Sequence, residues 1–425
     1  MKANLLRLVQ KAKGASRILA NLSRDKKNEA LYRMADSLRH EKEKILSANA
    51  KDVKNARRAK LSEALIGRLC LDEERLEGMS RSLREIAQLR DPVGEIMREW
   101  ERPNGLRIQK VRVPIGVILI IYESRPNVTS DCAGLCLKSG NSVVLRGGSE
   151  SIHSNQAVAK VLAVSLEKIS IPAEAVVMVP TTDRRAINLL LKMDSFINLV
   201  IPRGGEGLIR EVNEKSRIPV IKHYKGVCHV YVDRSADLGI AERVVYNAKV
   251  QRPGVCNAAE ALLVHKEIAQ KFLPMMAERL VSAGVQLRCS PEALKILEKN
   301  PQLKESPRIK KVNQDDWGRE FMDLILAVRV VNDLDSAIDH IGRYGSQHSD
   351  AIIAQDEKSV EQFTQQVDSS AVFVNTSTRF NDGGEFGMGA EMGISTDKIH
   401  ARGPMGLEEL TSYKYIVVGQ GQIRE

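Results

Sequence analysis

Residues 117–121 have the sequence Val117-Ile118-Leu119-Ile120-Ile121, an entirely apolar and mostly β-branched run that predicts a strand buried on both faces. Three runs of the same kind follow at intervals of roughly 20 to 35 residues, the length of a strand-helix-strand unit. They are Val143-Val144-Leu145, Val176-Val177-Met178-Val179 and Ile197-Asn198-Leu199-Val200-Ile201. This spacing predicts an α/β fold with a parallel, doubly wound sheet of the nucleotide-binding type.

Polar loops follow three of these runs, at the strand ends where a doubly wound sheet binds its ligands. They are Glu123-Ser124-Arg125-Pro126-Asn127, Arg146-Gly147-Gly148-Ser149-Glu150 and Pro202-Arg203-Gly204-Gly205-Glu206-Gly207. Each opens a predicted helix, whose free N–H groups and dipole favour an anion. We expect Gly204-Gly205 to let the backbone approach a pyrophosphate, and Arg146 to pair with a ribose or its 2′-phosphate. Because no complete G-x-G-x-x-G pattern is present, an ordinary strand-to-helix turn is the alternative for each loop.

A predicted helix over 236–248 leads into a cysteine loop, Val250-Gln251-Arg252-Pro253-Gly254-Val255-Cys256-Asn257-Ala258. A second α/β region follows, with predicted strands at 262–264, 324–328, 352–353 and 371–374. Pro253-Gly254 predicts a tight turn just before the thiol. Lys249 and Arg252 are nearby cations, which favour a thiolate. We predict a nucleophile at Cys256 near the junction of the two regions; the alternative is a buried structural thiol.

Composition bounds the function of the 425-residue chain. Its net charge is +10, from 64 basic and 54 acidic residues, but the charges are interleaved and aromatic residues make up only 4%. This composition favours anionic small molecules over nucleic acid, and a basic nucleic-acid-binding protein is kept as the alternative from another class. We find no signal peptide or membrane span, and we expect a cytoplasmic protein. Six scattered cysteines without C-x-x-C spacing predict neither disulfides nor a metal site.

Three further segments have recognisable patterns. Residues 1 to about 90 are predicted to form helices with charged outer faces. Residues 98–113 contain Asn104-Gly105 between alternating segments, which predicts a β-hairpin, and Tyr413 to Val418 predicts a strand that pairs with it or with another subunit. Residues 375–395 form a glycine-rich polar loop, for which a functional loop and a mobile connection are the alternatives.

Together these stretches resemble the aldehyde dehydrogenase superfamily, and within it the NADPH-dependent reductases of an acyl phosphate in proline biosynthesis. The similar stretches occur in the family's order and span nearly the whole chain. They are Pro114 to Ile118 with Tyr122 to Asn127, Val143 to Gly148, Ile201 to Gly205, Gln251 to Ala258, Ala337 to Ile341 with Gln347 to Ile352, and Asn375 to Phe380.

The resemblance implies two Rossmann-like three-layer α/β/α domains and a β-hairpin oligomerisation arm. The cofactor domain is expected at 1–97 and 114–235, the catalytic domain at 236–404, and the arm at 98–113 and 405–425. Partners implied by the resemblance are further copies of the chain and a functional association with glutamate 5-kinase.

The implied reaction is the NADPH-dependent reduction of L-glutamyl 5-phosphate to glutamate 5-semialdehyde through a thioester on Cys256. Ser124 or Asn127 is expected to join the Cys256 N–H as oxyanion donor. The implied cofactor contacts are Arg146, Gly147, Gly148, Pro202, Arg203, Gly204, Gly205 and Glu320, the last to the nicotinamide ribose. The implied substrate contacts are Arg125, Arg252, Asn375, Thr378 and Arg379, with Asp382 or Glu385 for the ammonium group.

One departure from the hydrolytic members of the superfamily bears on the reaction. Those enzymes activate water with a glutamate in a Glu-Leu-Gly-Gly stretch, and the equivalent stretch here is His223-Tyr224-Lys225-Gly226. Ser124 likewise replaces their oxyanion asparagine. A thioester that is exchanged with phosphate needs no water-activating carboxylate, so we predict acyl-phosphate chemistry; a hydrolytic aldehyde dehydrogenase is the alternative.

Overall fold

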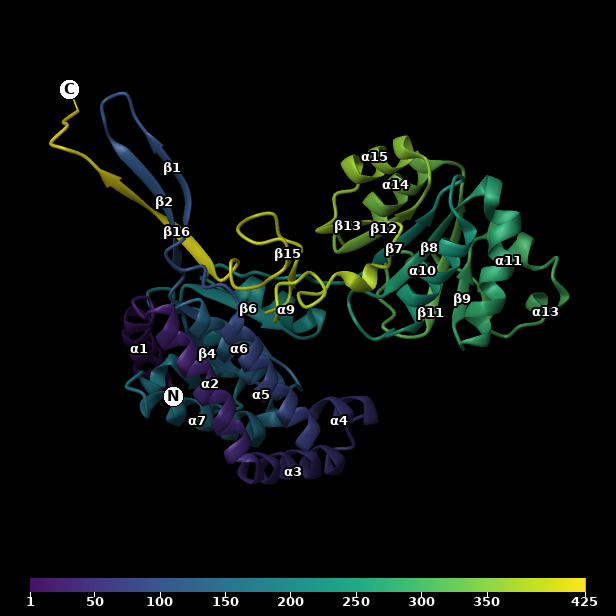
Figure 1. Ribbon diagram of the computed structural model, residues 1–425. Helices are drawn as coiled ribbons and strands as arrows, with labels where there is room; N and C mark the ends of the chain where they lie inside the picture. Colours follow the sequence, from purple (N-terminus) through teal and green to yellow (C-terminus); the bar gives the residue numbers. More distant parts are fainter. Residues whose placement is uncertain (425) are drawn as a thin grey trace. The chain divides into compact units, whose positions relative to one another are not determined.

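The computed structural model describes residues 1–424 and contains two compact units. The first comprises Met1–Lys222, Gly387–Gly393 and Pro404–Glu425, and the second comprises His223–Phe386 and Ile394–Gly403. Figure 1 shows a parallel sheet with flanking helices in each. The predicted α/β class with two Rossmann-like domains is confirmed. No helix among the described residues is both long and apolar enough to cross a bilayer.

The first unit is built on a four-stranded parallel sheet with the order β5-β4-β3-β6. Its strands are β3 (Val117–Tyr122), β4 (Ser142–Arg146), β5 (Val176–Met178) and β6 (Leu199–Arg203). All six side chains of β3 are buried, as its continuous apolar run predicts. Its helices are α1 (Lys2–Leu19), α2 (Arg24–His40), α3 (Lys42–Arg58), α4 (Glu63–Leu69), α5 (Glu73–Gln88), α6 (Asn127–Lys138), α7 (Ile152–Glu167), α8 (Arg184–Leu190) and α9 (Glu206–Lys215), with 3₁₀ turns at Ser149–Ser151 and Ala173–Ala175.

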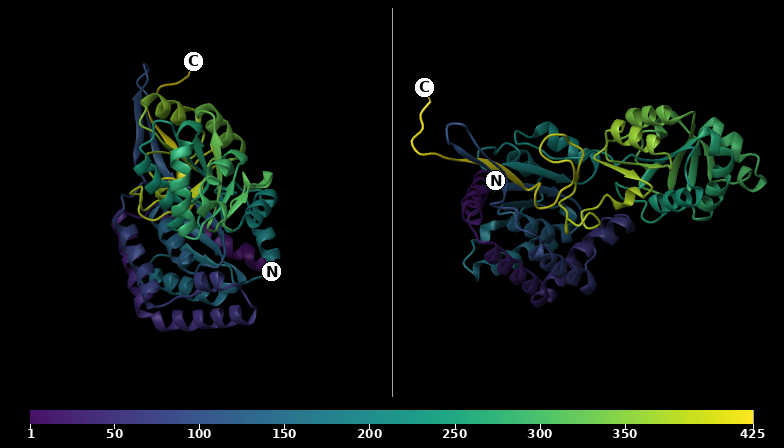
Figure 2. Two further views of the ribbon diagram at one scale, coloured as in Figure 1. Left: turned by 90° about the vertical axis from the view of Figure 1, so that its right-hand side faces the viewer. Right: turned by 45° about the horizontal axis from the view of Figure 1, so that its top comes forward.

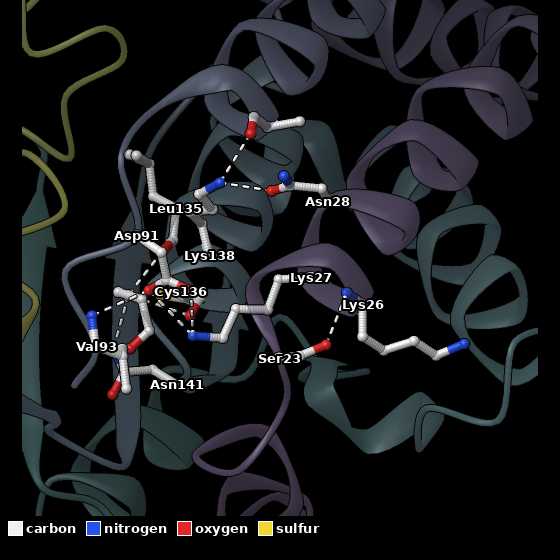
Figure 3. Close-up of polar contacts among 12 residues, drawn as sticks. Ser23, Lys26, Lys27, Asn28, Asp91, Val93, Leu135, Cys136, Lys138 and Asn141 are labelled. Atoms are coloured by element: carbon white, nitrogen blue, oxygen red, sulfur yellow. Dashed lines mark hydrogen bonds and ion pairs between the residues drawn. The ribbon is translucent and has the colours of Figure 1, made fainter.

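Two buried lysines connect three helices of this unit, α2, α5 and α6, with one another and with the segment after α5. Lys27 of α2 forms an ion pair of 2.9 Å with Asp91, and Lys138 of α6 donates to Asn28 at 2.5 Å and to the carbonyl of Ala87 at 2.8 Å (Figure 3). Burial lowers the pKa of Lys138 to about 8. Lys27 thus ties α2 to the segment after α5, and Lys138 ties α6 to α2 and α5.

The arm of the first unit is a three-stranded antiparallel sheet with the order β1-β2-β16. Its strands are β1 (Ile96–Glu101), β2 (Arg107–Pro114) and β16 (Thr411–Val418). The Asn104-Gly105 turn joins β1 to β2, as predicted, and Gly105 has a φ of +82°. Figure 2 shows the arm extending away from the helices of its own unit. The terminal strand therefore pairs with the hairpin within the same chain.

The second unit contains a seven-stranded parallel sheet with the order β10-β9-β11-β8-β7-β12-β13. Its strands are β7 (Cys228–Val232), β8 (Ala259–His265), β9 (Gln286–Cys289), β10 (Ile309–Lys311), β11 (Ile325–Val331), β12 (Ser349–Ile353) and β13 (Ala371–Val374). Its helices are α10 (Leu238–Val250), α11 (Lys266–Ser282), α12 (Pro291–Leu297), α13 (Pro301–Lys304), α14 (Leu334–Tyr344) and α15 (Glu357–Gln366), with 3₁₀ turns at Gln314–Asp316 and Thr378–Phe380. The short strands β14 (Ile394–Ser395) and β15 (Gly403–Pro404) follow in the chain.

The predicted domain limits differ from these units in one respect that matters for the site. We expected residues 223–235 in the cofactor domain, but β7 pairs with β8 and β12 in the second sheet. The physical reason is its sequence, Cys228 to Val232, which is fully buried and hydrogen-bonds on both edges. Residues 387–393, expected in the catalytic domain, belong to the first unit.

Candidate functional site

Three segments meet at one edge of the second sheet because they precede neighbouring parallel strands. His223 lies five residues before β7, Cys256 three residues before β8, and His348 immediately before β12. The strand order β8-β7-β12 places the amino ends of these strands side by side. Parallel strands have all their amino ends at the same edge of a sheet, so residues far apart in sequence converge there.

The cysteine loop has the turn structure that its Pro-Gly pair predicts. It runs from the end of α10 to the start of β8, and Cys256 is half-buried. Gly226 packs directly against it: a Cβ atom on Gly226 would lie 2.7 Å from Cys256 Cα and 2.6 Å from the Cys256 carbonyl carbon. Cys228 Sγ donates to the Cys256 carbonyl oxygen over 3.2 Å. The stretch headed by His223 therefore forms part of the immediate surroundings of the thiol.

His223, Cys256 and His348 form a cluster in which one ring nitrogen of each histidine and the sulfur all lie within 4.8 Å of one another. The His223 ring is oriented by a 2.9 Å hydrogen bond between Nδ1 and the Ile394 carbonyl oxygen. His348 is fully buried, and its Nδ1 lies 2.7 Å from Ser349 Oγ. Burial lowers the pKa of His348 to about 3, so this imidazole is neutral at neutral pH.

Arg379 is the cation held against the cysteine loop. Its Nε donates to Gln251 Oε1 over 2.9 Å, and its Nη1 donates to Asn257 Oδ1. Burial and the nearby charge of Arg252 lower its pKa, while the charge of Cys256 raises it. The structure thus holds Arg379, one of the predicted substrate arginines, against the loop that carries Arg252 and Cys256.

We expected Lys249 to be a cation that favours the Cys256 thiolate, but it forms an ion pair with a carboxylate. Its ammonium group is buried and lies 2.7 Å from Glu260 Oε2, so its charge is balanced by that carboxylate. Burial raises the pKa of Glu260 to about 7, and the charge of half-buried Glu320 adds to this effect. Arg379, more than a hundred positions away in the sequence, contacts the cysteine loop instead.

Thr378 and Asn375 support loops of the second unit. Thr378 is fully buried and donates to the Asn257 carbonyl oxygen over 2.8 Å. Asn375, whose φ is +55°, accepts from the Ala354 N–H and donates to the Ala354 carbonyl, both over 2.9 Å. Their side-chain hydrogen bonds hold backbone in place, whereas we had expected contacts with a substrate.

Asp382 and Glu385 lie on the exposed part of the same loop. Asp382 Oδ1 accepts the backbone N–H of Gly384 over 2.9 Å and closes a local turn. Asn381, just before it, is buried and donates to Ser349 Oγ over 2.7 Å. The predicted loop 375–395 therefore has a structured first part that contacts the segment carrying His348.

The predicted oxyanion donors of the first unit hold carboxylates of that unit. Ser124, which has a φ of +41°, donates to Glu150 Oε1 through its N–H over 2.6 Å and its hydroxyl over 2.7 Å. Asn127 donates to Asp131 Oδ2 over 3.1 Å. The hydrogen-bonding capacity that we expected an oxyanion to use is therefore directed to these two carboxylates, and Arg125 between them is exposed.

Carboxylates also occupy the predicted phosphate loops. Glu123 Oε2 accepts the Gly205 N–H over 3.0 Å at the start of α9, and a Cβ atom on Gly204 would lie 2.8 Å from the Glu123 carboxyl carbon. At Gly205 itself a Cβ atom would meet no described atom within 4 Å. The backbone at the start of α9 is therefore open to a ligand once the exposed Glu123 side chain turns away.

The other candidate cofactor residues of the first unit have structural partners there, whereas Glu320 belongs to the second unit. Arg146 is buried and donates to the carbonyls of Gly147 over 2.9 Å and Thr182 over 2.8 Å. Burial lowers its pKa, and its Nε has no hydrogen-bond partner among the described residues. Gly148 precedes a 3₁₀ turn, and Pro202 and Arg203 are the last two residues of β6. Pro202 pairs with Ile121 of β3, and Arg203 donates to the Met392 carbonyl.

The sequence assigns no role to two of the three residues in the cluster of His223, Cys256 and His348. His348 lies in a stretch that only resembles the family, and His223 stands where the hydrolytic enzymes have a glutamate. The signal that could have found them is their position just before buried strands, because the amino ends of neighbouring parallel strands meet.

The sequence and fold of the chain are similar to those of known proteins. The model of the aldehyde dehydrogenase family matches residues 1–292. The chain is 53% identical over 425 residues to the gamma-glutamyl phosphate reductase of Thermodesulfovibrio yellowstonii, covering 100% of both chains, and 53% identical over 416 residues to that of a Thermoanaerobacter species, covering 98% of each. The solved gamma-glutamyl phosphate reductase of Thermotoga maritima is similar with a TM-score of 0.95 at 44% identity, covering 99% of this chain and 100% of that one.

Proposed function

The chain belongs to the aldehyde dehydrogenase family and, within it, to the gamma-glutamyl phosphate reductases, and on this premise we propose that Cys256 forms a thioester with the γ-carbonyl of L-glutamyl 5-phosphate. The product is L-glutamate 5-semialdehyde, as in proline biosynthesis. The observation that carries the proposal is the surroundings of Cys256, where a histidine, His223, heads the stretch packed against the thiol. The relatives' names support this reaction over hydrolysis of an aldehyde-derived thioester and over nucleic-acid binding.

The thiol chemistry follows from groups of the second unit. Arg379 and Arg252 provide positive charge near the sulfur, which favours the thiolate and attracts an acyl phosphate. The thiolate attacks the γ-carbonyl carbon, a carbon–sulfur bond forms, and the bond from that carbon to the phosphate oxygen breaks with its electron pair. We assign the Cys256 backbone N–H as oxyanion donor, since Ser124 and Asn127 donate to carboxylates of the first unit.

Reduction of the thioester requires a nicotinamide dinucleotide, which is the cofactor of the family, and we propose NADPH. The first unit fits such a ligand at the start of α9, where no described atom lies within 4 Å of a Cβ position on Gly205 and the helix dipole favours a phosphate. The phosphate would replace the Glu123 carboxylate that now accepts from the Gly205 N–H. Gly204, Gly205 and Arg146 are the proposed contacts. When bound, the cofactor supplies the hydride that converts the thioester to the aldehyde.

Phosphate dependence tests the proposed function. We expect purified enzyme to reduce NADP⁺ with glutamate 5-semialdehyde only when inorganic phosphate is present, because phosphate must attack the thioester in this direction. Cys256→Ser should abolish this turnover. Cys70→Ser is the matched control, since Cys70 is also half-buried but lies in the first unit. Phosphate-independent turnover to free glutamate would overturn the proposal.

We also propose that the arm mediates assembly of several copies of the chain. The outer strands of the arm's sheet, β1 and β16, each have an edge that pairs with no other strand among residues 1–424, and the strands expose large apolar side chains. They include Ile96, Met97, Tyr413, Tyr415, Val417 and Val418. Light scattering after gel filtration measures the mass, and truncation before Tyr413 should reduce it. Association with a glutamate 5-kinase remains a proposal that co-elution would test.

A further inference from the structure

The cluster of His223, Cys256 and His348 has the composition of a site for a thiophilic divalent cation. Two imidazoles and one thiolate are the ligands that Zn²⁺ prefers, and three protein ligands with an open fourth position form a common zinc geometry. The three donor atoms lie within 4.8 Å of one another. Tetrahedral Zn²⁺ with bonds of about 2.0–2.3 Å needs its ligands about 3.3–3.6 Å apart, so the separations must shrink by at most about 1.5 Å. Half-buried His223 and Cys256 can supply this by side-chain rotation.

The hydrogen bonds around the two rings orient them as metal ligands are usually oriented. The Nδ1 of His223 faces the Ile394 carbonyl oxygen, and the Nδ1 of His348 faces Ser349 Oγ and lies 3.7 Å from Cys228 Sγ. The Nε2 of His348, which has no partner among the described residues, is therefore the nitrogen of that ring that can bind a cation. Ser349 Oγ also accepts a hydrogen bond from Asn381, so its position is fixed. Such outer contacts set the tautomer and the direction of a ligating histidine.

An independent observation points to a ligand at this place. The Nε2 of His348 is buried and has no hydrogen-bond partner among the described residues, although the residue is fully enclosed. A buried polar atom without a partner is costly, and its lone pair is available to an electrophile such as a metal ion. Cys256 and His348 thus belong to the same cluster, and His348 contributes a ring nitrogen without a partner among the described residues.

We propose that this cluster binds one Zn²⁺ per chain and that the bound ion inhibits the enzyme reversibly. On binding, Cys256 releases its thiol proton to solvent and its sulfur bonds to the metal. The sulfur electron pair is then unavailable for attack on an acyl carbon. The inhibitory consequence rests on the proposed function, whereas the binding itself does not.

Direct binding measurements test the proposal separately from activity. Titration calorimetry with Zn²⁺ on the full chain should give one site, and Co²⁺ should produce the charge-transfer absorption of a cobalt–thiolate bond. His223→Gln and Cys256→Ser should each weaken Zn²⁺ binding at least about 10-fold. His153→Gln, which changes an exposed histidine of the first unit, and Cys70→Ser should leave it unchanged. His348→Gln is a secondary variant because the residue is buried.

The outcomes separate the two proposals. Zinc binding that is lost in His223→Gln and Cys256→Ser supports the site even when turnover of the semialdehyde is not observed. Where turnover is observed, Zn²⁺ should inhibit competitively with the semialdehyde, and a chelator should restore full activity. Binding of equal strength in the wild type, His223→Gln and Cys256→Ser would overturn the site, as would the absence of binding at equimolar metal. Inhibition that survives in His223→Gln would overturn the assignment of inhibition to this cluster.

Discussion

Replacing Gly226 with alanine tests whether close packing of the 223–226 stretch sets the position of the nucleophile. The added Cβ would lie 2.7 Å from Cys256 Cα, whereas ordinary contacts begin at 3.4 Å. The 223–226 stretch and the cysteine loop must therefore separate by about 0.7 Å or more. The contacted atoms are backbone atoms of Cys256, which cannot rotate away as a side chain would. A displacement near 1 Å of a reacting group costs about 100-fold in rate. We expect Gly226→Ala to lower kcat about 10- to 100-fold and to destabilise the fold by about 1–3 kcal/mol.

The assay is phosphate-dependent reduction of NADP⁺ by glutamate 5-semialdehyde, combined with the rate of Cys256 alkylation by iodoacetamide and thermal unfolding. Gly342→Ala is the matched control. Gly342 is exposed within α14 of the same unit, and a Cβ atom there would meet no described atom within 4 Å. The control should keep its activity and gain up to about 1 kcal/mol of stability, because alanine favours helix over glycine. A Gly226→Ala enzyme with kcat within twofold of the wild type would refute the reasoning.

Three further substitutions are expected to have distinct effects. Arg379→Lys should lower kcat/KM about 10-fold or more, because a lysine cannot reproduce the two-armed contact with the cysteine loop; unchanged steady-state kinetics would contradict this. Asn375→Ala should lower the free energy of unfolding by about 2 kcal/mol, because two hydrogen bonds to Ala354 are lost. The KM for the semialdehyde should not change; a raised KM would instead support the substrate contact that the sequence suggested. Burial lowers the pKa of Lys138 to about 8 in the folded protein, whereas a lysine in the unfolded chain has a pKa of about 10.4. Between these two pH values the unfolded chain binds more protons than the folded protein, so this residue makes the free energy of unfolding rise with pH. Urea unfolding of Lys138→Met should lack that rise, and identical pH profiles would exclude the effect.

The sequence by itself determined the elements and the chemical class of the chain. The apolar run at 117–121 becomes a fully buried strand, and the Asn104-Gly105 pair becomes a hairpin turn. The Pro253-Gly254 pair places Cys256 on a turn. These features depend on the conformational preferences of neighbouring residues, which are encoded locally. The resemblance to aldehyde dehydrogenases rests on such local stretches, and the comparisons confirm it.

Only the tertiary structure decided which side chains surround the thiol. His223, Cys256 and His348 converge because β8, β7 and β12 are neighbours in the sheet, and nothing in the local sequence specifies that order. The scattered histidines and cysteines predicted no metal site for the same reason. Polar contacts likewise depend on proximity in three dimensions. Lys249 forms an ion pair with Glu260, Asn375 donates to the Ala354 carbonyl, and Ser124 donates to Glu150. The local sequence predicts Cys256 as the nucleophile, whereas strand order decides which side chains lie near it.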